Sequence, residues 1–132
     1  MIFVDTSFFV ALRVSPDPHH GAAIALLQTT GREPLITSNH VRGETWTFLR
    51  RKVGHGAAVG FLDALSASRH VRVEAVTPQL EERALSWLRR RDEREYSFVD
   101  ATSFALMRSM RIRHALTFDG DFAAAGFTEL RP

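Results

Sequence analysis

Four carboxylates lie among apolar residues: Asp5, Glu44, Asp100 and Asp119. Most other acids lie where solvated acids normally lie, and five of them lie in Arg-rich segments as expected ion-pair partners: Glu81, Glu82, Asp92, Glu93 and Glu95. Acidic side chains rarely have apolar neighbours unless they are paired or bind something, so this placement indicates partial burial. Clustered carboxylates repel one another, and they therefore shift their pKa values or bind a cation. Because the chain has no cysteine and no suitably spaced histidine pair, the ligands would all be oxygens, which favour Mg²⁺ or Mn²⁺.

Divalent ions held by carboxylates activate water and stabilise a leaving oxygen in phosphoryl transfer. Basic residues share the segment of Glu44, namely Arg42, Arg50, Arg51 and Lys52. Basic groups beside an acidic cleft favour a polyanionic backbone over a small neutral substrate. The pattern therefore predicts a metal-dependent enzyme that acts on nucleic acid. An ordinary solvated helix face is the alternative explanation of the basic residues.

Two of the four acids have a second explanation as helix caps. Asp5 follows an apolar run and precedes a helix, where Asp is a favourable N-cap. Asp100 stands three residues after Ser97, which matches a capping box with Asp in the place of the usual Glu or Gln.

The other two acids also have alternatives. Glu44 would be a surface acid paired with His40 or Arg51, and Asp119 would belong to an Asp-Gly turn. Asp121 lies in the same loop and is an alternative to Asp119 as a ligand. Each alternative is reasonable by itself, but their coincidence in four places favours a common site.

Short apolar runs alternate with segments of helical period along the whole chain. Strands are expected over 2–4, 34–37, 71–75, 115–117 and 127–130, and helices over 6–14, 19–30, 39–52, 57–68, 78–91 and 97–110. This alternation predicts a parallel sheet flanked by helices, with ligands at the carboxyl ends of its strands. Asp5 and Asp119 leave strand ends, and Asp100 and Glu44 lie in early helical turns, so all four can converge on one cleft.

The composition is that of one globular domain covering residues 1–132. Hydrophobic residues make up 45% and charged residues 24% of the chain, which excludes disordered and collagen-like classes. The absence of cysteine excludes disulfides, thiolate metal sites and a Cys nucleophile. No segment approaches the ~20 apolar residues of a membrane span, and the N-terminus lacks a basic n-region. We therefore expect a cytoplasmic protein without membrane contact; the net charge of +2 carries no information about partners.

Four segments, in order along the chain, resemble the PIN-domain ribonucleases, and within them the VapC-type toxins of bacterial toxin–antitoxin pairs. They are 2–7 (IFVDTS), 37–46 (TSNHVRGETW), 96–103 (YSFVDATS) and 116–122 (LTFDGDF). The resemblance implies a single three-layer α/β/α domain with a central, mostly parallel sheet. It also implies metal-binding roles for the four acids, with Asp119 or Asp121 as the fourth ligand, and orienting roles for the hydroxyls of Thr6, Ser7 and Thr117.

The family resemblance also carries expectations about activity and partners. It implies an Mg²⁺- or Mn²⁺-dependent endoribonuclease that inhibits translation, and the segments around Glu44 and Asp100 resemble the branch that cuts the sarcin–ricin loop of 23S rRNA. Other branches cut tRNA. The resemblance further implies a homodimer and a VapB-type antitoxin whose tail occupies the acidic cleft.

Three other readings compete with this one. The same acids would serve a small metal phosphatase or a DNA-directed nuclease. A catalytically inactive PIN module would bind RNA or protein without cutting it, although the presence of all four acids argues against this. A histidine-based ribonuclease would draw on His19, His20, His40, His55, His70 or His114, none of which lies in a recognisable catalytic pairing.

Overall fold

The computed structural model describes residues 1–132 and contains one five-stranded sheet in which every strand pairing is parallel. The strands lie in the order β3-β2-β1-β4-β5. Their bounds are Ile2–Val4 for β1, Leu35–Ser38 for β2, Val71–Glu74 for β3, His114–Leu116 for β4 and Thr128–Glu129 for β5. The expected α/β/α fold with a central, mostly parallel sheet is confirmed.

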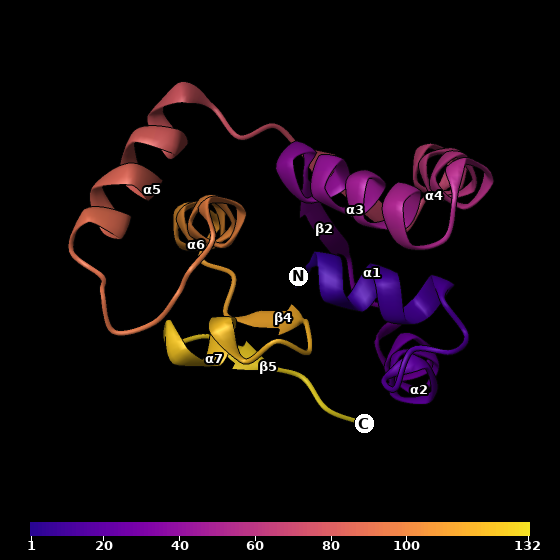
Figure 1. Cartoon of the computed structure of the whole chain (residues 1–132). Coiled ribbons are helices and arrows are strands. Elements are labelled where there is room, and N and C mark those ends of the chain that lie inside the picture. The colour runs from indigo at the N-terminus through magenta and orange to yellow at the C-terminus, as the bar shows by residue number, and fades with distance from the viewer.

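Seven helices connect the strands, and Figure 1 shows α1–α4 grouped on one side of the sheet and α5–α7 on the other. Right-handed crossovers produce this division, because the chain moves one way from β1 to β3 and the other way from β3 to β5. The helices are α1 (Thr6–Arg13), α2 (His20–Thr30), α3 (Asn39–Lys52), α4 (His55–Ala67), α5 (Pro78–Arg89), α6 (Phe98–Met110) and α7 (Asp121–Ala124). No helix combines the length and apolar character that a membrane crossing requires.

The direction of the strand order reverses at β1, which pairs with β2 on one side and β4 on the other. Open α/β sheets bind ligands at such a switch point, beyond the carboxyl ends of the strands. Val4 pairs with Leu116, and the Asp5 N–H donates to the Leu116 carbonyl at 3.1 Å. The residues after β1 and β4, Asp5 and Thr117, therefore emerge side by side.

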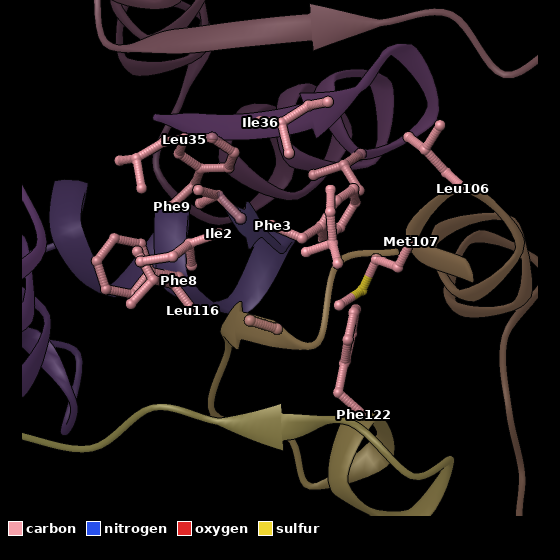
Figure 2. Close-up of a cluster of buried hydrophobic side chains, with 14 of the residues drawn as sticks. Ile2, Phe3, Phe8, Phe9, Leu35, Ile36, Leu106, Met107, Leu116 and Phe122 are labelled. Carbon is pink, nitrogen blue, oxygen red and sulfur yellow. The ribbon is translucent and has the colours of Figure 1, made fainter. Parts of the chain in front are cut away.

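The core lies on both faces of the central strands. All three residues of β1 are buried, as expected for a strand covered by helices on each face. Figure 2 shows side chains from β1, α1, β2, α6, β4 and α7 packed together, among them Phe3, Phe8, Met107 and Phe122. Each buried large apolar side chain contributes about 1.5–3 kcal/mol. The scaffold behind the switch point is thus firmly packed.

All the expected strands and helices are present, with bounds that shift by at most two residues, and two of the differences have a local cause. Helix α4 begins at His55 rather than at 57, because Gly54 adopts a φ of 142° and turns the chain directly from α3 into α4. The short helix α7 was not expected; it follows Gly120, whose φ of 80° suits glycine.

Candidate active site

Asp5, Glu44 and Asp119 line one cleft of about 300 Å³ at the carboxyl ends of β1 and β4. Three different elements supply them: the end of β1, the second turn of α3 and the loop after β4. Asp100 enters from the first turn of α6, and its charge and that of Asp119 both act on Asp5. The fold therefore brings together the four acids singled out in the sequence.

Asp5 occupies the N-cap position of α1, but its side chain makes no capping hydrogen bond. It is 2% exposed, and its Oδ2 accepts hydrogen bonds from Thr117 Oγ1 at 3.0 Å and from Ser7 Oγ at 3.3 Å. Its Oδ1 is buried without any hydrogen-bond partner. Leaving a buried carboxylate oxygen unpaired is costly, so capping does not explain this residue.

The hydroxyls of Ser7 and Thr117 form a network that fixes one oxygen of the Asp5 carboxylate. The two hydroxyl oxygens lie 3.0 Å apart, and Ser7 Oγ accepts the Phe118 N–H at 2.9 Å. Thr117 Oγ1 also lies 3.4 Å from Asp119 Oδ1. This network links the ends of β1 and β4 and leaves the other Asp5 oxygen free.

Glu44 is half-buried and accepts the Thr6 hydroxyl at 2.6 Å through Oε1. The ion pair with His40 or Arg51 that the sequence allowed does not form: His40 contacts Glu81 at 3.3 Å, and neither Glu44 nor Arg51 takes part in a salt bridge. The contact with Thr6 ties α3 to the start of α1, directly beside Asp5.

The structure confirms the capping explanation of Asp100 and leaves one of its carboxylate oxygens free for a ligand. The capping box is present: Ser97 Oγ accepts the Asp100 N–H at 2.9 Å, and Asp100 Oδ2 accepts the Ser97 N–H at 3.2 Å. The residue is 6% exposed, and Oδ1 takes part in no hydrogen bond. One oxygen fixes the side chain and the other remains available to a ligand.

Asp119 and Asp121 share the loop after β4. Asp119 Oδ1 accepts the Asp121 N–H at 2.9 Å, so the expected Asp-Gly turn is present. Arg94 binds the Asp121 carboxylate, and its Nη2 donates to the Asp119 carbonyl at 3.3 Å. Carboxylate oxygens of Asp100, Asp119 and Asp121 all lie within 4.8 Å of one another.

Burial raises the pKa of three of these acids. For Asp5 the pKa lies well above its usual range, through burial first and then through the charges of Asp119 and Asp100. Burial raises the pKa of Asp100 to about 7, against hydrogen bonds from Ser97 and with the charges of Asp119 and Asp121. Burial also raises the pKa of Asp119, and the charge of Asp121 adds to this. Each acid is thus unfavourably placed when charged and alone.

A divalent cation fits this donor set. Three carboxylates converge within 4.8 Å, and Asp5 adds a buried oxygen without a protein partner. A hard divalent ion prefers such an all-oxygen environment, and it would relieve the repulsion that raises the pKa values.

The four basic residues of α3 separate into two pairs. Arg51 and Lys52 line a groove of about 530 Å³, and Glu44 and Phe48 line both this groove and the acidic cleft. Arg42 and Arg50 are exposed but line neither. Only the first pair therefore lies along a continuous path to the acids.

The cleft contains residues that the sequence did not single out for it, namely Asp17, His19, Phe48 and Phe118. Arg94, which pairs with Asp121 beside the cleft, was likewise not singled out in the sequence. One signal was available: Asp17 and His19 flank Pro18, in a polar segment directly after the helix that Asp5 precedes.

Both the sequence and the fold are similar to those of known proteins. Residues 2–128 match the PIN domain family. The chain is 59% identical over 133 residues to 23S rRNA-specific endonuclease VapC20 of two Mycobacterium tuberculosis strains, over 100% of this chain and 99% of that protein. It superposes on the crystal structure of Mycobacterium tuberculosis VapC20, a sarcin–ricin loop cleaving toxin, with a TM-score of 0.93 and 57% identity over 100% of both chains.

Proposed function

This chain belongs to the PIN-domain family, and from that premise we propose that it is a metal-dependent endoribonuclease toxin of a VapBC-type system. The observation that carries the proposal is the convergence of Asp5, Glu44 and Asp119 on one cleft, with Asp100 close enough for its charge to act on Asp5. One oxygen of Asp5 is buried there without a hydrogen-bond partner. All 132 residues would form one nuclease domain.

The proposed substrate is the sarcin–ricin loop of 23S rRNA, whose cleavage inhibits translation. Identity of 59% over the whole length of a 23S rRNA-specific endonuclease supports this choice over tRNA. The same likeness to a nuclease, together with the intact acids, weighs against a binding module without activity. An rRNA substrate would place the enzyme in the cytoplasm.

Asp5, Asp100 and Asp119 would hold the divalent ion, Mg²⁺ or Mn²⁺, with Glu44 completing the acidic cleft. When bound, the ion supplies activation of water and neutralises charge at the phosphate. Thr117 and Ser7 keep Asp5 oriented, and Thr6 does the same for Glu44. We assign the fourth ligand to Asp119 rather than Asp121, because Asp119 lines the cleft with Asp5 and Glu44, whereas Asp121 does not line it and pairs with Arg94.

Arg51 and Lys52 would bind the RNA backbone as it enters the cleft, since they line the adjoining groove. Phosphate contacts of this kind release counterions and make binding depend on salt. Arg42 and Arg50 would add a weaker, longer-range attraction.

The proposed function implies a VapB-type antitoxin that inhibits the enzyme by placing its tail in the acidic cleft. A short upstream reading frame that encodes a small DNA-binding protein would support this pairing. Loss of cleavage when that protein is co-purified with the toxin would establish it, and undiminished cleavage in the stable complex would contradict it.

A homodimer is also part of the proposal. Leu85 on α5 and Phe98 on α6 are 36% and 40% exposed. Phe98 packs near His40, which contacts Glu81, a residue one helical turn before Leu85 on α5. Such an apolar surface suits a second copy of the chain. Light scattering should report a dimer for the purified protein, and Leu85→Glu should shift it toward monomer.

Analysis of the fragment ends tests the proposed reaction. The purified enzyme should cut a sarcin–ricin hairpin with Mg²⁺ or Mn²⁺, leave 5′-phosphate and 3′-hydroxyl ends, and stop in EDTA. A histidine base acting on the 2′-hydroxyl would instead leave a 2′,3′-cyclic phosphate and ignore chelators. Cyclic phosphate ends formed in EDTA would overturn the carboxylate assignment. Cleavage of a DNA copy of the hairpin would favour the DNA nuclease.

A further inference from the structure

Three rings stack from the core outward into the acidic cleft. Phe8 on α1 is 1% exposed and stacks against Phe118, with centroids 5.9 Å apart and an interplanar angle of 20°. Phe118 stacks in turn against the imidazole of His19, at 4.5 Å and 3°. The stack therefore begins at a buried ring and ends at an exposed one.

The inner part of this stack is firmly held. The Phe118 N–H donates to Ser7, whose hydroxyl also contacts Asp5, and the Arg131 guanidinium lies 5.4 Å from the Phe118 ring. Asp17 Oδ1 accepts a hydrogen bond from the backbone N–H of His19 at 2.8 Å. This contact fixes the turn that carries the imidazole. A ring positioned before binding loses little conformational freedom when a ligand stacks on it.

His19 lies at the mouth of the acidic cleft, because it lines the same cavity as Asp5, Glu44 and Asp119. It is exposed and stacks on no ring other than Phe118, so no aromatic side chain covers its second face. Packing alone explains the face against Phe118. It does not explain why the stack ends with an open aromatic face beside the acids.

Building on the proposed RNA cleavage, we infer that His19 is a nucleobase-stacking residue that receives an unpaired base next to the scissile phosphate. Proteins that recognise looped or single-stranded RNA stack splayed bases on aromatic and histidine rings, and any base offers a suitable face. A base inside a duplex would first have to leave its helix. His19 therefore favours loops and bulges over paired RNA.

Replacement of the ring tests this role in kinetics. His19→Ala should lower kcat/KM on the hairpin roughly 5- to 100-fold, mainly through KM, because one stacked base is lost. His19→Phe should restore most of the loss, since it keeps a flat ring without a titratable nitrogen. The matched control is His70→Ala, an exposed histidine at the opposite ends of the strands, which should leave kcat/KM unchanged.

A fluorescence experiment detects the stacking without cleavage. Once the fragment ends locate the scissile bond, 2-aminopurine replaces the base on either side of it, and RNA binds in the Asp100→Asn background. One of the two probes should be quenched on binding. The quench should disappear with His19→Ala and persist with His19→Phe.

The outcomes separate this inference from the proposed function. If His19→Phe is as impaired as His19→Ala, or if His19→Ala leaves the quench intact, the stacking role is wrong. Cleavage of the hairpin without a His19-dependent quench contradicts the stacking role and keeps the proposed function. RNA that does not bind at all contradicts both.

Discussion

The two ends of the sheet carry cavities of opposite character. At the amino ends of the strands lies the larger one, of about 560 Å³, and its only acid, Glu33, has a side chain 60% exposed to solvent. The cleft at the carboxyl ends is smaller, about 300 Å³, yet Asp5 on its floor is 2% exposed. The candidate site is therefore distinguished by acids that are buried despite their mutual repulsion, and not by the size of its cavity.

The largest expected effect is the difference in cleavage activity between a substitution at the carboxyl ends of the strands and one at the amino ends. Asp5→Asn should lower cleavage by at least about 1,000-fold, since it removes the charge from the oxygen buried without a partner. Glu33→Gln at the opposite end should leave it unchanged. Initial rates of hairpin cleavage measure both, and retained activity in Asp5→Asn would remove the carboxyl-end cleft from the mechanism.

The raised pKa values predict a pH-dependent stability. Because the pKa of Asp100 rises from 3.8 to about 7, the folded protein binds more protons than the unfolded chain between about pH 4 and 7. The free energy of unfolding without metal should therefore fall by roughly 2–4 kcal/mol as the pH rises through this window. Urea titrations measure it.

Two variants make that experiment selective. Asp100→Asn should reduce the pH dependence, with the raised pKa values of Asp5 and Asp119 accounting for what remains. It should leave stability at pH 8 equal to or above that of the wild type, while Asn still accepts the Ser97 N–H. Glu33→Gln should retain the full dependence. If the free energy of unfolding of the wild type rises from pH 4 to 7, the pKa values of the buried acids are not raised by folding, which contradicts this prediction.

The hydroxyl network sharpens the comparison further. Thr117→Val keeps the shape of a side chain that is 0% exposed and removes the hydroxyl that contacts Asp5 and Asp119. Loss of a group that orients a ligand should weaken Mg²⁺ activation by about 10- to 100-fold. The control is Thr128→Val, an exposed threonine on β5. A metal titration of the cleavage rate that is identical for both variants would contradict the orienting role.

The smallest expected effect separates the basic residues of α3. Arg51→Ala should weaken RNA binding a few-fold and reduce the slope of log affinity against log salt by about one, because a phosphate contact is lost. Arg50→Ala should change the slope less, since Arg50 does not line the groove. Equal slopes for the two variants would assign both arginines to the general surface.

Much of the site follows from the order of short segments. Asp5 and Thr117 emerge together because they follow adjacent parallel strands, and alternation of strands and helices is sufficient to predict that. The sequence presented helix capping and metal binding as alternative roles for Asp100. A carboxylate has two oxygens, so one of them can cap the helix while the other binds a metal ion. The structure assigns the capping bond to Oδ2 and leaves Oδ1 free.

The remaining features of the site depend on contacts between distant segments, which no local sequence pattern predicts. Arg94 binds Asp121 and His19 stacks on Phe118 through loops that are far apart in the chain. The distinction between Arg50 and Arg51 was within reach, because Arg51 lies seven residues after Glu44 and returns to the same helix face. Turn geometry at Gly54 and Gly120 set the helix bounds that the periodicity missed.

Calorimetric titration with Mn²⁺ tests most directly whether the carboxyl-end acids form a divalent metal site. At pH 7 the wild type should bind Mn²⁺ saturably and release protons, since Asp100 has a pKa of about 7 and must be charged to bind. Heats measured in two buffers of different ionisation enthalpy give the proton count, which should fall toward zero above pH 8.5. Asp100→Asn should abolish binding and Glu33→Gln should preserve it. Absence of saturable binding in the wild type, or binding unchanged in Asp100→Asn, would contradict the account.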